Sequence, residues 1–389
     1  MMRRFGSVSA TLFLLLSTEA QAEPWVRTYV IEWYEAANFY GAKEGTTKPG
    51  SDCPQGSMPS PDWVKVFVEA GYTEKEAKWL RDPANPTREP NNGQPMMAFR
   101  GINRQNVYDY PETTPESGIP AVAGSIALGF NLDGDVKTGF VSPTGEKGID
   151  HAHYKALGCL KDMRGPARLS ERGKGANDSM REGAWTVVIV VSGQGKDPAN
   201  DANVRVGIYS SGDKIVRDGE GNVAQDYSFR IKPDARMQAL FDGSTRKGVI
   251  SAKAASTLWM RGPDSAELKL AKAQLRLEMK PDGSLSGMIG GYRPWRPIYE
   301  AMVNARGPVV EPLGWVRLPD VYYALRRYAD YSPTGPGGEK TYISYNMRVD
   351  ATPAYVVNPD ASGTVKQAQL FPPSETDVVA AGKSVASTS

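Results

Sequence analysis

The chain has 389 residues and a formal net charge of +2 at pH 7, with basic and acidic side chains mixed along its length. This length suits one large domain or two of medium size, with enough residues for a sizeable core. The near-neutral charge gives no electrostatic field that would favour nucleic acid or an anionic membrane surface, so we expect neither as a partner.

Residues 1–22 have the order of a secretory signal peptide. A start with two arginines is followed by an apolar run through Leu12–Leu16, and the segment ends in Ala20-Gln21-Ala22. We therefore expect cleavage before Glu23 and a periplasmic or secreted protein. The apolar run is too short for a permanent transmembrane helix, and no later apolar segment approaches about 20 residues, so no membrane span is expected in the mature chain.

Residues 23–120 are predicted to form a strand, a helical pair and an irregular connection. Aromatic and β-branched side chains predict the strand at 26–34. Capping residues, including a Thr and Glu capping box before the second helix, predict short helices at 63–69 and 74–81. Residues 83–120 are dense in Pro, Asn and Gly, which indicates a long connection.

Residues 121–361 are predicted to form a β-rich main domain. Strand patterns occur at 125–131, 185–191, 204–209, 227–231, 275–279, 285–289 and 343–349. Short strands joined by Gly-rich turns favour antiparallel layers. The expected fold class is therefore mainly β (β-rich α+β), with an antiparallel β-sandwich-like core and a short N-terminal helical elaboration.

Two helices are expected to interrupt the strands of the main domain. Pro297 suits the first position of a helix at 298–304, and Asp320 is expected to cap a helix at 321–331. Residues 362–389 lose periodicity and are rich in Ala, Ser and Thr, so we expect a mobile tail.

The chain contains two cysteines, Cys53 and Cys159. In an oxidising compartment two cysteines most simply pair, which predicts a structural disulfide. The alternative is a redox-active or metal-binding pair, which usually requires a C-x-x-C spacing or further ligands close by. Neither cysteine has such neighbours.

His151 and His153 are the only histidines and lie two residues apart. On a strand this spacing would place both imidazoles on one face, where they could bind zinc or copper. The alternative is a pair of ordinary polar residues beside a turn. The segment 154–157 has a more helical pattern, which would direct the two rings apart.

Asp133, Asp135 and Asp150 form a second candidate metal site. Closely spaced carboxylates suit calcium, and Asp150 also adjoins the histidine pair. The spacing does not fit the twelve-residue helix–loop–helix calcium motif, and Asp-Gly-Asp is also common in plain turns. Calcium and zinc are therefore the candidate metals, with a turn as the alternative.

Tyr292, Arg293 and Trp295 follow a Gly-Gly pair and form a candidate ligand-binding segment. Aromatic rings next to an arginine could stack a sugar or a planar ligand. The alternative is a Gly-Gly bend in which the tryptophan closes the edge of the core.

Several motifs together resemble a family of exported bacterial proteins of unknown function. They are Asp52-Cys53-Pro54, Gly148-Ile149-Asp150 with Tyr154 and Leu157-Gly158-Cys159, Asn203 to Tyr209, and Gly290-Gly291-Tyr292. The resemblance implies export and a Cys53–Cys159 bridge and brings no activity with it. In that family Asn usually follows Gly-Ile-Asp, so His151 departs from the pattern, which counts against a metal site there.

The sequence contains no G-x-S-x-G elbow, no P-loop and no C-x-x-C-H haem motif. The leading hypothesis is an exported non-catalytic binding or accessory protein for a small molecule or a cell-envelope partner. The competing hypothesis is a metal-assisted hydrolase acting on an envelope polymer or glycan, with the three aspartates as metal or acid–base groups. The sequence leaves open whether the chain is an enzyme.

Overall fold

A computed structural model describes most of the chain between residues 25 and 367. The described ranges are 25–40, 52–56, 62–69, 72–82, 84–85, 101–164, 171–225, 227–262, 267–304, 314–359 and 365–367. The predicted signal peptide lies outside these ranges, as do residues 368–389 of the predicted tail.

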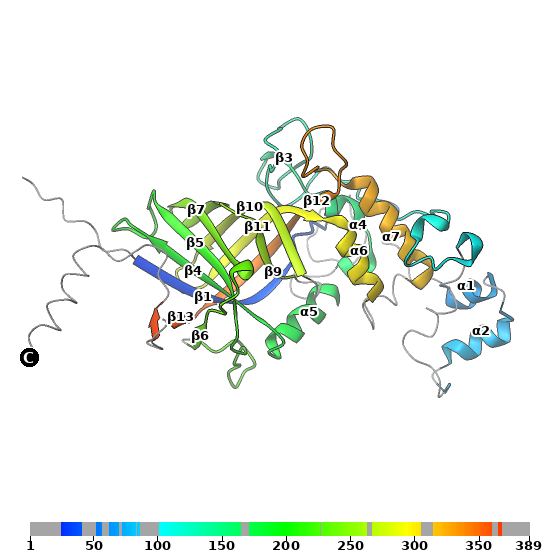
Figure 1. Ribbon diagram of the computed structural model, residues 1–389, viewed down its shortest axis with the longest axis horizontal. Helices are drawn as coiled ribbons and strands as arrows, with labels where there is room; N and C mark the ends of the chain where they lie inside the picture. Colours follow the sequence, from blue (N-terminus) through cyan, green and yellow to red (C-terminus); the bar gives the residue numbers. More distant parts are fainter. Residues whose placement is uncertain are drawn as a thin grey trace, which may run out of the picture.

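Eight antiparallel strands close into a barrel (Figure 1). They are β1 (Trp25–Ala36), β4 (Thr186–Gly193), β5 (Val204–Ser211), β7 (Gln238–Arg246), β8 (Val249–Ala254), β10 (Glu267–Met279), β11 (Leu285–Pro294) and β12 (Tyr342–Pro353). Each strand pairs with the next in this order, and β12 returns to pair with β1. The topology is therefore an up-and-down meander that closes on itself.

The β-rich class is confirmed, but the sandwich-like core is wrong because the sheet is a closed barrel. Alternation of buried and exposed residues along each strand is common to both architectures. What distinguishes them here is the pairing of β1 with β12, in which Tyr29 lies opposite Pro353. No local pattern reveals a contact between strands so far apart in the chain.

The barrel interior is filled with apolar side chains that form one cluster. In β10, Leu275 and Leu277 are buried inside, whereas Arg276 and Glu278 face outward. An eight-stranded barrel is just wide enough for side chains to fill it, and here they do.

Strand β4 is buried along its whole length. A small sheet of β6 (Ser228–Arg230), β13 (Tyr355–Pro359) and β14 (Val365–Gln367) accounts for part of this, because β13 contacts both β1 and β4 from outside the barrel. The continuous apolar pattern of residues 185–191 therefore correctly indicates a strand covered on both faces.

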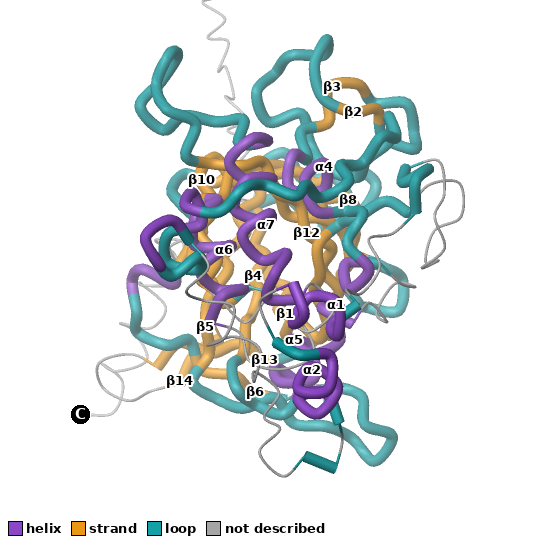
Figure 2. The backbone as a smooth tube through the Cα atoms, turned by 90° about the vertical axis from the view of Figure 1, so that its right-hand side faces the viewer, coloured by secondary structure: helices purple, strands orange, loops and turns teal. Residues whose placement is uncertain are grey.

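Helices gather at one end of the barrel, which we call the helical end (Figures 1 and 2). They include α4 (Ala152–Leu157), α6 (Trp295–Asn304) and α7 (Gly314–Tyr328), with α1 (Trp63–Glu69) and α2 (Glu74–Arg81) farther out. Buried apolar residues from these helices form a second core cluster beside the barrel. Helix α5 (Glu171–Arg181) packs on β1 and leads into β4.

Short elements complete the described fold. They are β2 (Phe140–Val141), β3 (Lys147–Ile149), β9 (Leu258–Arg261), and the 3-10 turns η1 (Ile102–Arg104), η2 (Pro111–Thr113), η3 (Lys161–Met163) and η4 (Ala235–Met237). Strand β9 pairs only with the first residues of β10, at the helical end.

Most predicted elements are confirmed, but residues 125–131 and the starts of the two main-domain helices differ, and Pro297 is the third residue of α6 rather than its first. The helical pair has the predicted bounds, and its capping box between Thr73 and Glu76 is formed. Residues 125–131 contribute only isolated bridges rather than a strand. Helix α7 begins at Gly314, so Asp320 lies inside it, and its carboxylate accepts hydrogen bonds from Ser117 instead of capping. Strand β14 lies within the segment expected to be a mobile tail.

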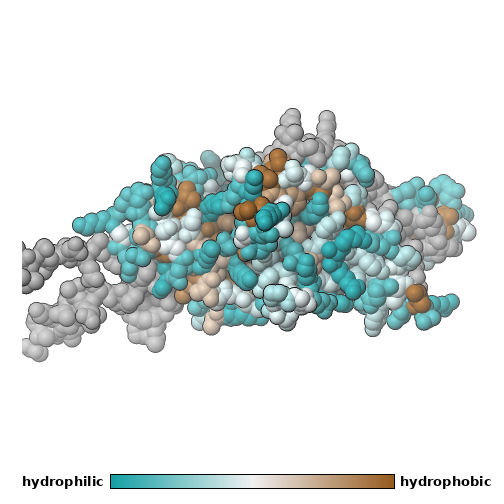
Figure 3. All heavy atoms as spheres, turned by 90° about the horizontal axis from the view of Figure 1, so that it is seen from above, coloured by the Kyte–Doolittle hydropathy of each residue, from teal (hydrophilic) through white to brown (hydrophobic). Residues whose placement is uncertain are grey.

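Figure 3 shows a largely hydrophilic face on which apolar residues form small, separate groups. Within the part of the chain that the structure describes, no helix has the length and apolar character needed to cross a membrane.

Candidate functional site

Asp133 and Asp135 lie on an exposed turn whose backbone uses their carboxylates. The N–H of Asp135 donates to Oδ1 of Asp133 at 2.7 Å, and the N–H of Lys137 donates to Oδ1 of Asp135 at 2.8 Å. These are side-chain-to-backbone bonds typical of Asx turns. The Asp-Gly-Asp sequence therefore has a local structural role.

Asp150 is buried and holds the start of the same loop. Its Oδ2 accepts the backbone N–H of Leu132 at 2.7 Å and that of Asp133 at 3.1 Å. Burial raises the pKa of this carboxyl to about 6, although both hydrogen bonds act to lower it. The buried amide of Asn346 donates to the carbonyl of Asp150 at 2.7 Å, which fixes the loop on β12.

His151 and His153 are both buried at the start of α4. Burial lowers the pKa of His151 to about 3, so its imidazole is neutral, and its Nδ1 lies 2.9 Å from the carbonyl of Leu128. The rings of both histidines meet Tyr345 edge-on, with centroid distances of 5.0 Å for His153 and 6.4 Å for His151. The helical pattern after His153 is thus confirmed by α4.

The five predicted metal ligands do not converge. Among the described residues, no three His, Cys, Asp or Glu side chains are arranged so that they could hold a metal ion. Two hydrogen bonds join members of this set, and in both a backbone N–H donates to a carboxylate: Asp135 to Asp133 and Asp133 to Asp150. Calcium or zinc binding by Asp133, Asp135, Asp150, His151 and His153 stays a sequence-based prediction that this arrangement does not favour.

Tyr292, Arg293 and Trp295 are all buried, so they form no open stacking surface. Tyr292 lies on the outer side of the barrel and stacks on Tyr331, with ring centroids 4.2 Å apart. The Arg293 guanidinium lies over the ring of Tyr345. Trp295 belongs to the helical core cluster. The three side chains therefore point to different environments.

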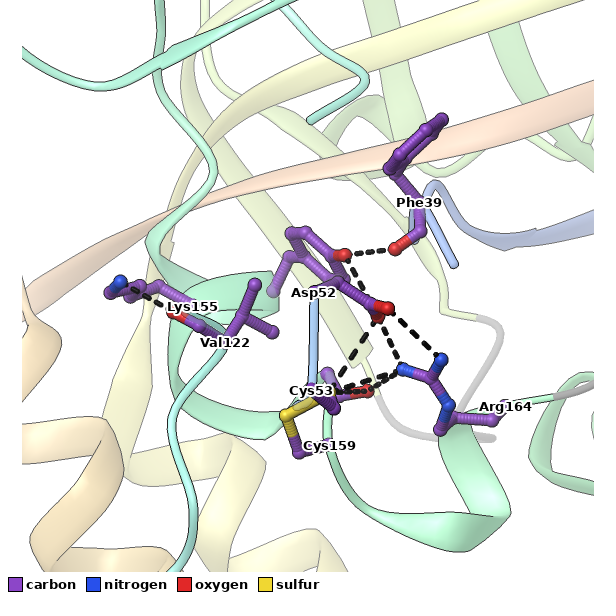
Figure 4. The surroundings of a disulfide bond; sticks show 9 residues. Phe39, Asp52, Cys53, Val122, Lys155, Cys159 and Arg164 are labelled. Atoms are coloured by element: carbon purple, nitrogen blue, oxygen red, sulfur yellow. Dashed lines mark hydrogen bonds and ion pairs between the residues drawn. A yellow bond between two sulfur atoms is a disulfide. The ribbon is translucent and has the colours of Figure 1, made fainter. Parts of the chain in front are cut away.

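The predicted disulfide between Cys53 and Cys159 is confirmed. Figure 4 shows it beside a buried ion pair between Asp52 and Arg164. The Tyr154 hydroxyl donates to the carbonyl of Phe39 and also lies 3.3 Å from Asp52. Because nearly all of this cluster is buried, we interpret it as structural and not as a binding site.

A hollow of about 370 Å³ lies at the helical end of the barrel. Its wall includes the start of β4, the end of β5, strand β9 and the start of β10. Three cations line it: Lys214, Lys232 and Arg261. None of the three forms a salt bridge with another described residue.

The same hollow also has apolar side chains in its lining. They include Trp185, Met237 and Met260. Trp185 is held by a 2.7 Å hydrogen bond from its Nε1 to the hydroxyl of Tyr34, and the Arg261 guanidinium lies 5.3 Å from the centroid of its ring. The tryptophan and the arginine are therefore positioned before any ligand arrives.

The two carboxylates that line this hollow already have partners. Asp213 is bound by Arg230, and that hydrogen bond lowers the pKa of Asp213, which keeps it ionised. Glu267 lies 3.2 Å from a guanidinium nitrogen of Arg236. With both acids paired, the hollow presents an excess of positive charge.

Two wider hollows lie elsewhere on the described surface. One, of about 520 Å³, lies at the opposite end of the barrel, where turns carrying Pro198 and Pro281 and the end of β12 at Pro353 form part of its wall. Another, of about 730 Å³, shares Asp213 and Lys214 with the first hollow, and residues of β6 and β13 form much of the rest of its wall. Of these three hollows, the one at the helical end combines a fixed aromatic ring with three cations that form no salt bridge with a described residue.

Sequence reasoning missed the residues of this hollow. Lys214, Lys232 and Arg261 come from three segments that are separate in the sequence and meet only in the fold. Trp185 marked the start of a predicted strand and gave no sign of a site. Comparison of the chain with known protein families, with curated proteins and with solved structures found no match.

Proposed function

We propose that this chain is an exported binding protein that holds a small anion with an apolar face in the hollow at the helical end. The single observation that carries the proposal is the set of three cations, Lys214, Lys232 and Arg261, that line one hollow together with a fixed tryptophan. Cations bind carboxylate, sulfate or phosphate through charge-assisted hydrogen bonds. Small-molecule sites combine apolar side chains with precisely placed polar groups, and this hollow contains both kinds, with polar groups prominent.

Export is part of the proposal and is supported by the leader pattern of residues 1–22 and by the disulfide. Disulfides persist mainly in oxidising compartments. The resemblance to exported bacterial proteins of unknown function supports the same location. The hydrolase hypothesis has weaker support, because backbone N–H groups occupy the carboxylates of Asp133, Asp135 and Asp150.

The test is calorimetric titration of the purified protein with 2-naphthoate and with 2-naphthamide, which keeps the ring and lacks the charge. We expect the anion to bind and the amide to bind at least about ten-fold more weakly, because a hydrogen bond to a charged group contributes about 1.5 kcal/mol or more. Arg261→Gln should weaken naphthoate binding by a similar factor. Equal affinity for the two compounds, or no binding of naphthoate, would disprove the proposal.

The matched control is Lys137→Gln, which removes one exposed positive charge on the loop that carries Asp135, away from the hollow. Its naphthoate affinity should equal that of the unmodified protein. A loss as large as that of Arg261→Gln would mean that net charge, and not the hollow, governs binding.

A further inference from the structure

Cations and aromatic rings alternate along the outer surface next to the hollow. We call this row the ladder, and its members are Arg236, Trp259, Lys269, Tyr342, Tyr331 and Lys272. The ring centroid of Trp259 lies 5.4 Å from the Arg236 guanidinium and 5.0 Å from the Lys269 ammonium. Lys269 also lies 5.9 Å from the Tyr342 ring, which meets Tyr331 edge-on.

Strand alternation directs the ladder outward. Trp259 of β9 pairs with Lys269 of β10, while their neighbours Met260 and Leu268 are buried in the core. Met260 lines the hollow, and the ladder member Arg236 immediately precedes Met237 of its wall. The ladder therefore begins beside the hollow and extends away from it over β9, β10 and β12.

A β-bulge places the last cation of the ladder. The register between β10 and β11 shifts between Ala271 and Gln274, and Lys272 within this shift has φ +50°. Positive φ is uncommon for residues other than glycine, and bulges redirect side chains out of the regular alternation. Here the bulge holds the Lys272 ammonium 4.7 Å from the centroid of Tyr331, which in turn stacks on Tyr292.

The ladder keeps most of its positive charge. Lys269 and Lys272 form no salt bridge with any described residue, and only Arg236 shares a carboxylate, that of Glu267. Acidic groups near the Tyr331 end are engaged elsewhere. Asp150 accepts backbone N–H groups, and Asp330 accepts two hydrogen bonds from Ser344.

We propose that the ladder binds an acidic polysaccharide. Spaced cations can pair with repeated carboxylates, and the half-buried rings hold these cations in place and add apolar surface between the charges. A membrane surface fits less well, because Trp259, Tyr331 and Tyr342 are half-buried and do not project. Nucleic acid fits less well because the whole chain is close to neutral. This surface is separate from the hollow and takes a polymer.

The test is titration of the purified protein with polygalacturonate and, as the uncharged counterpart, dextran. We expect polygalacturonate to bind, and its binding should weaken as the salt concentration rises, because salt screens exposed charges. Dextran, which is uncharged, should bind at least about ten-fold more weakly. Trp259→Ala and Lys272→Gln should each weaken polygalacturonate binding by about five-fold or more, because each removes one half of a cation–ring pair.

The controls are Tyr355→Ala, which removes a ring that is 52% exposed outside the ladder, and Lys137→Gln. Both should leave polygalacturonate affinity unchanged, and Trp259→Ala should leave naphthoate binding in the hollow unchanged. Unaltered affinity in both Trp259→Ala and Lys272→Gln would overturn the proposal. So would absent polygalacturonate binding, or tighter binding of poly(dT) or of phosphatidylglycerol vesicles.

Discussion

The Arg164 guanidinium lies 2.5 Å from the carboxylate of Asp52, and both side chains are almost completely buried. The same guanidinium donates to the carbonyl of Gly158 at 3.1 Å and lies 3.2 Å from Sγ of Cys53 (Figure 4). One arginine thus joins the two segments that the disulfide also joins. The ion pair and the covalent bond stabilise the same junction.

Arg164→Ala should lower the free energy of unfolding by about 3 to 5 kcal/mol, because it leaves the Asp52 carboxylate buried without a counter-charge. Urea denaturation of the two proteins measures the difference. The double variant Asp52→Ala/Arg164→Ala should lose less than the sum of the single variants, since removal of both partners leaves no uncompensated charge.

The matched control for the buried pair is Lys78→Ala, which breaks an exposed i,i+4 pair with Glu74 on α2. Exposed pairs contribute little, so its unfolding curve should coincide with that of the unmodified protein. If Arg164→Ala were equally neutral, the buried pair would not stabilise the junction.

The Cys53–Cys159 bond should account for a large part of the stability. It joins residues separated by 106 positions. The chain-entropy model gives about 4 to 5 kcal/mol for a loop of this size. Thiol titration of denatured, unreduced protein should find no free thiol, and the variant with both cysteines changed to Ala should unfold at much lower urea. Two reactive thiols in the untreated protein would contradict the bond.

Asp150 should make stability depend on pH in an unusual direction. Its pKa in the folded protein is about 6, above the ordinary value of 3.8, so the folded state holds this proton more tightly than the unfolded state. The contribution is therefore present below about pH 4 and is lost as pH rises to about 6, by roughly 2 to 3 kcal/mol. Asp150→Asn should lack this loss.

Urea unfolding of the protein and of Asp150→Asn at intervals from pH 4 to pH 7 gives the required difference. His151 acts in the opposite sense, because burial lowers its pKa to about 3, and it contributes equally to both proteins. The exposed Asp135→Asn serves as the control and should follow the unmodified protein. A difference between Asp150→Asn and the unmodified protein that does not change with pH would refute the assignment.

Local signals predicted local elements well in this chain. The capping box at Thr73 and Glu76 defined α2, and alternation at residues 275–279 followed by a Pro-Asp-Gly-Ser turn defined the hairpin of β10 and β11. Barrel closure was not predictable, because it depends on the register of β1 against β12. The predicted helix cap at Asp320 was wrong, because its carboxylate accepts a hydrogen bond from Ser117, a residue distant in the sequence.

For the candidate sites, too, local sequence signals do not reveal contacts between residues that are distant in the sequence. Sequence motifs drew attention to Asp150, His151 and Tyr292, whose special character is their burial inside the fold. Gly148, in the same motif, has φ +81°, and a Cβ there would lie 2.4 Å from the carbonyl oxygen of Asp135. The motif thus specifies how the loop packs. The cations of the hollow have no motif, since they converge only in three dimensions.

The proposed export predicts which residue begins the mature chain. Cleavage before Glu23 keeps Trp25, which begins β1, pairs with Gly193 and donates from Nε1 to the Asp201 carboxylate at 2.8 Å. Intact-mass analysis of the exported protein should therefore give a chain that begins at Glu23. Ala22→Leu should block cleavage, because the site requires a small residue. A protein that keeps Met1 and two reduced cysteines inside the cell would refute export, and a first residue beyond Trp25 would conflict with the closed barrel.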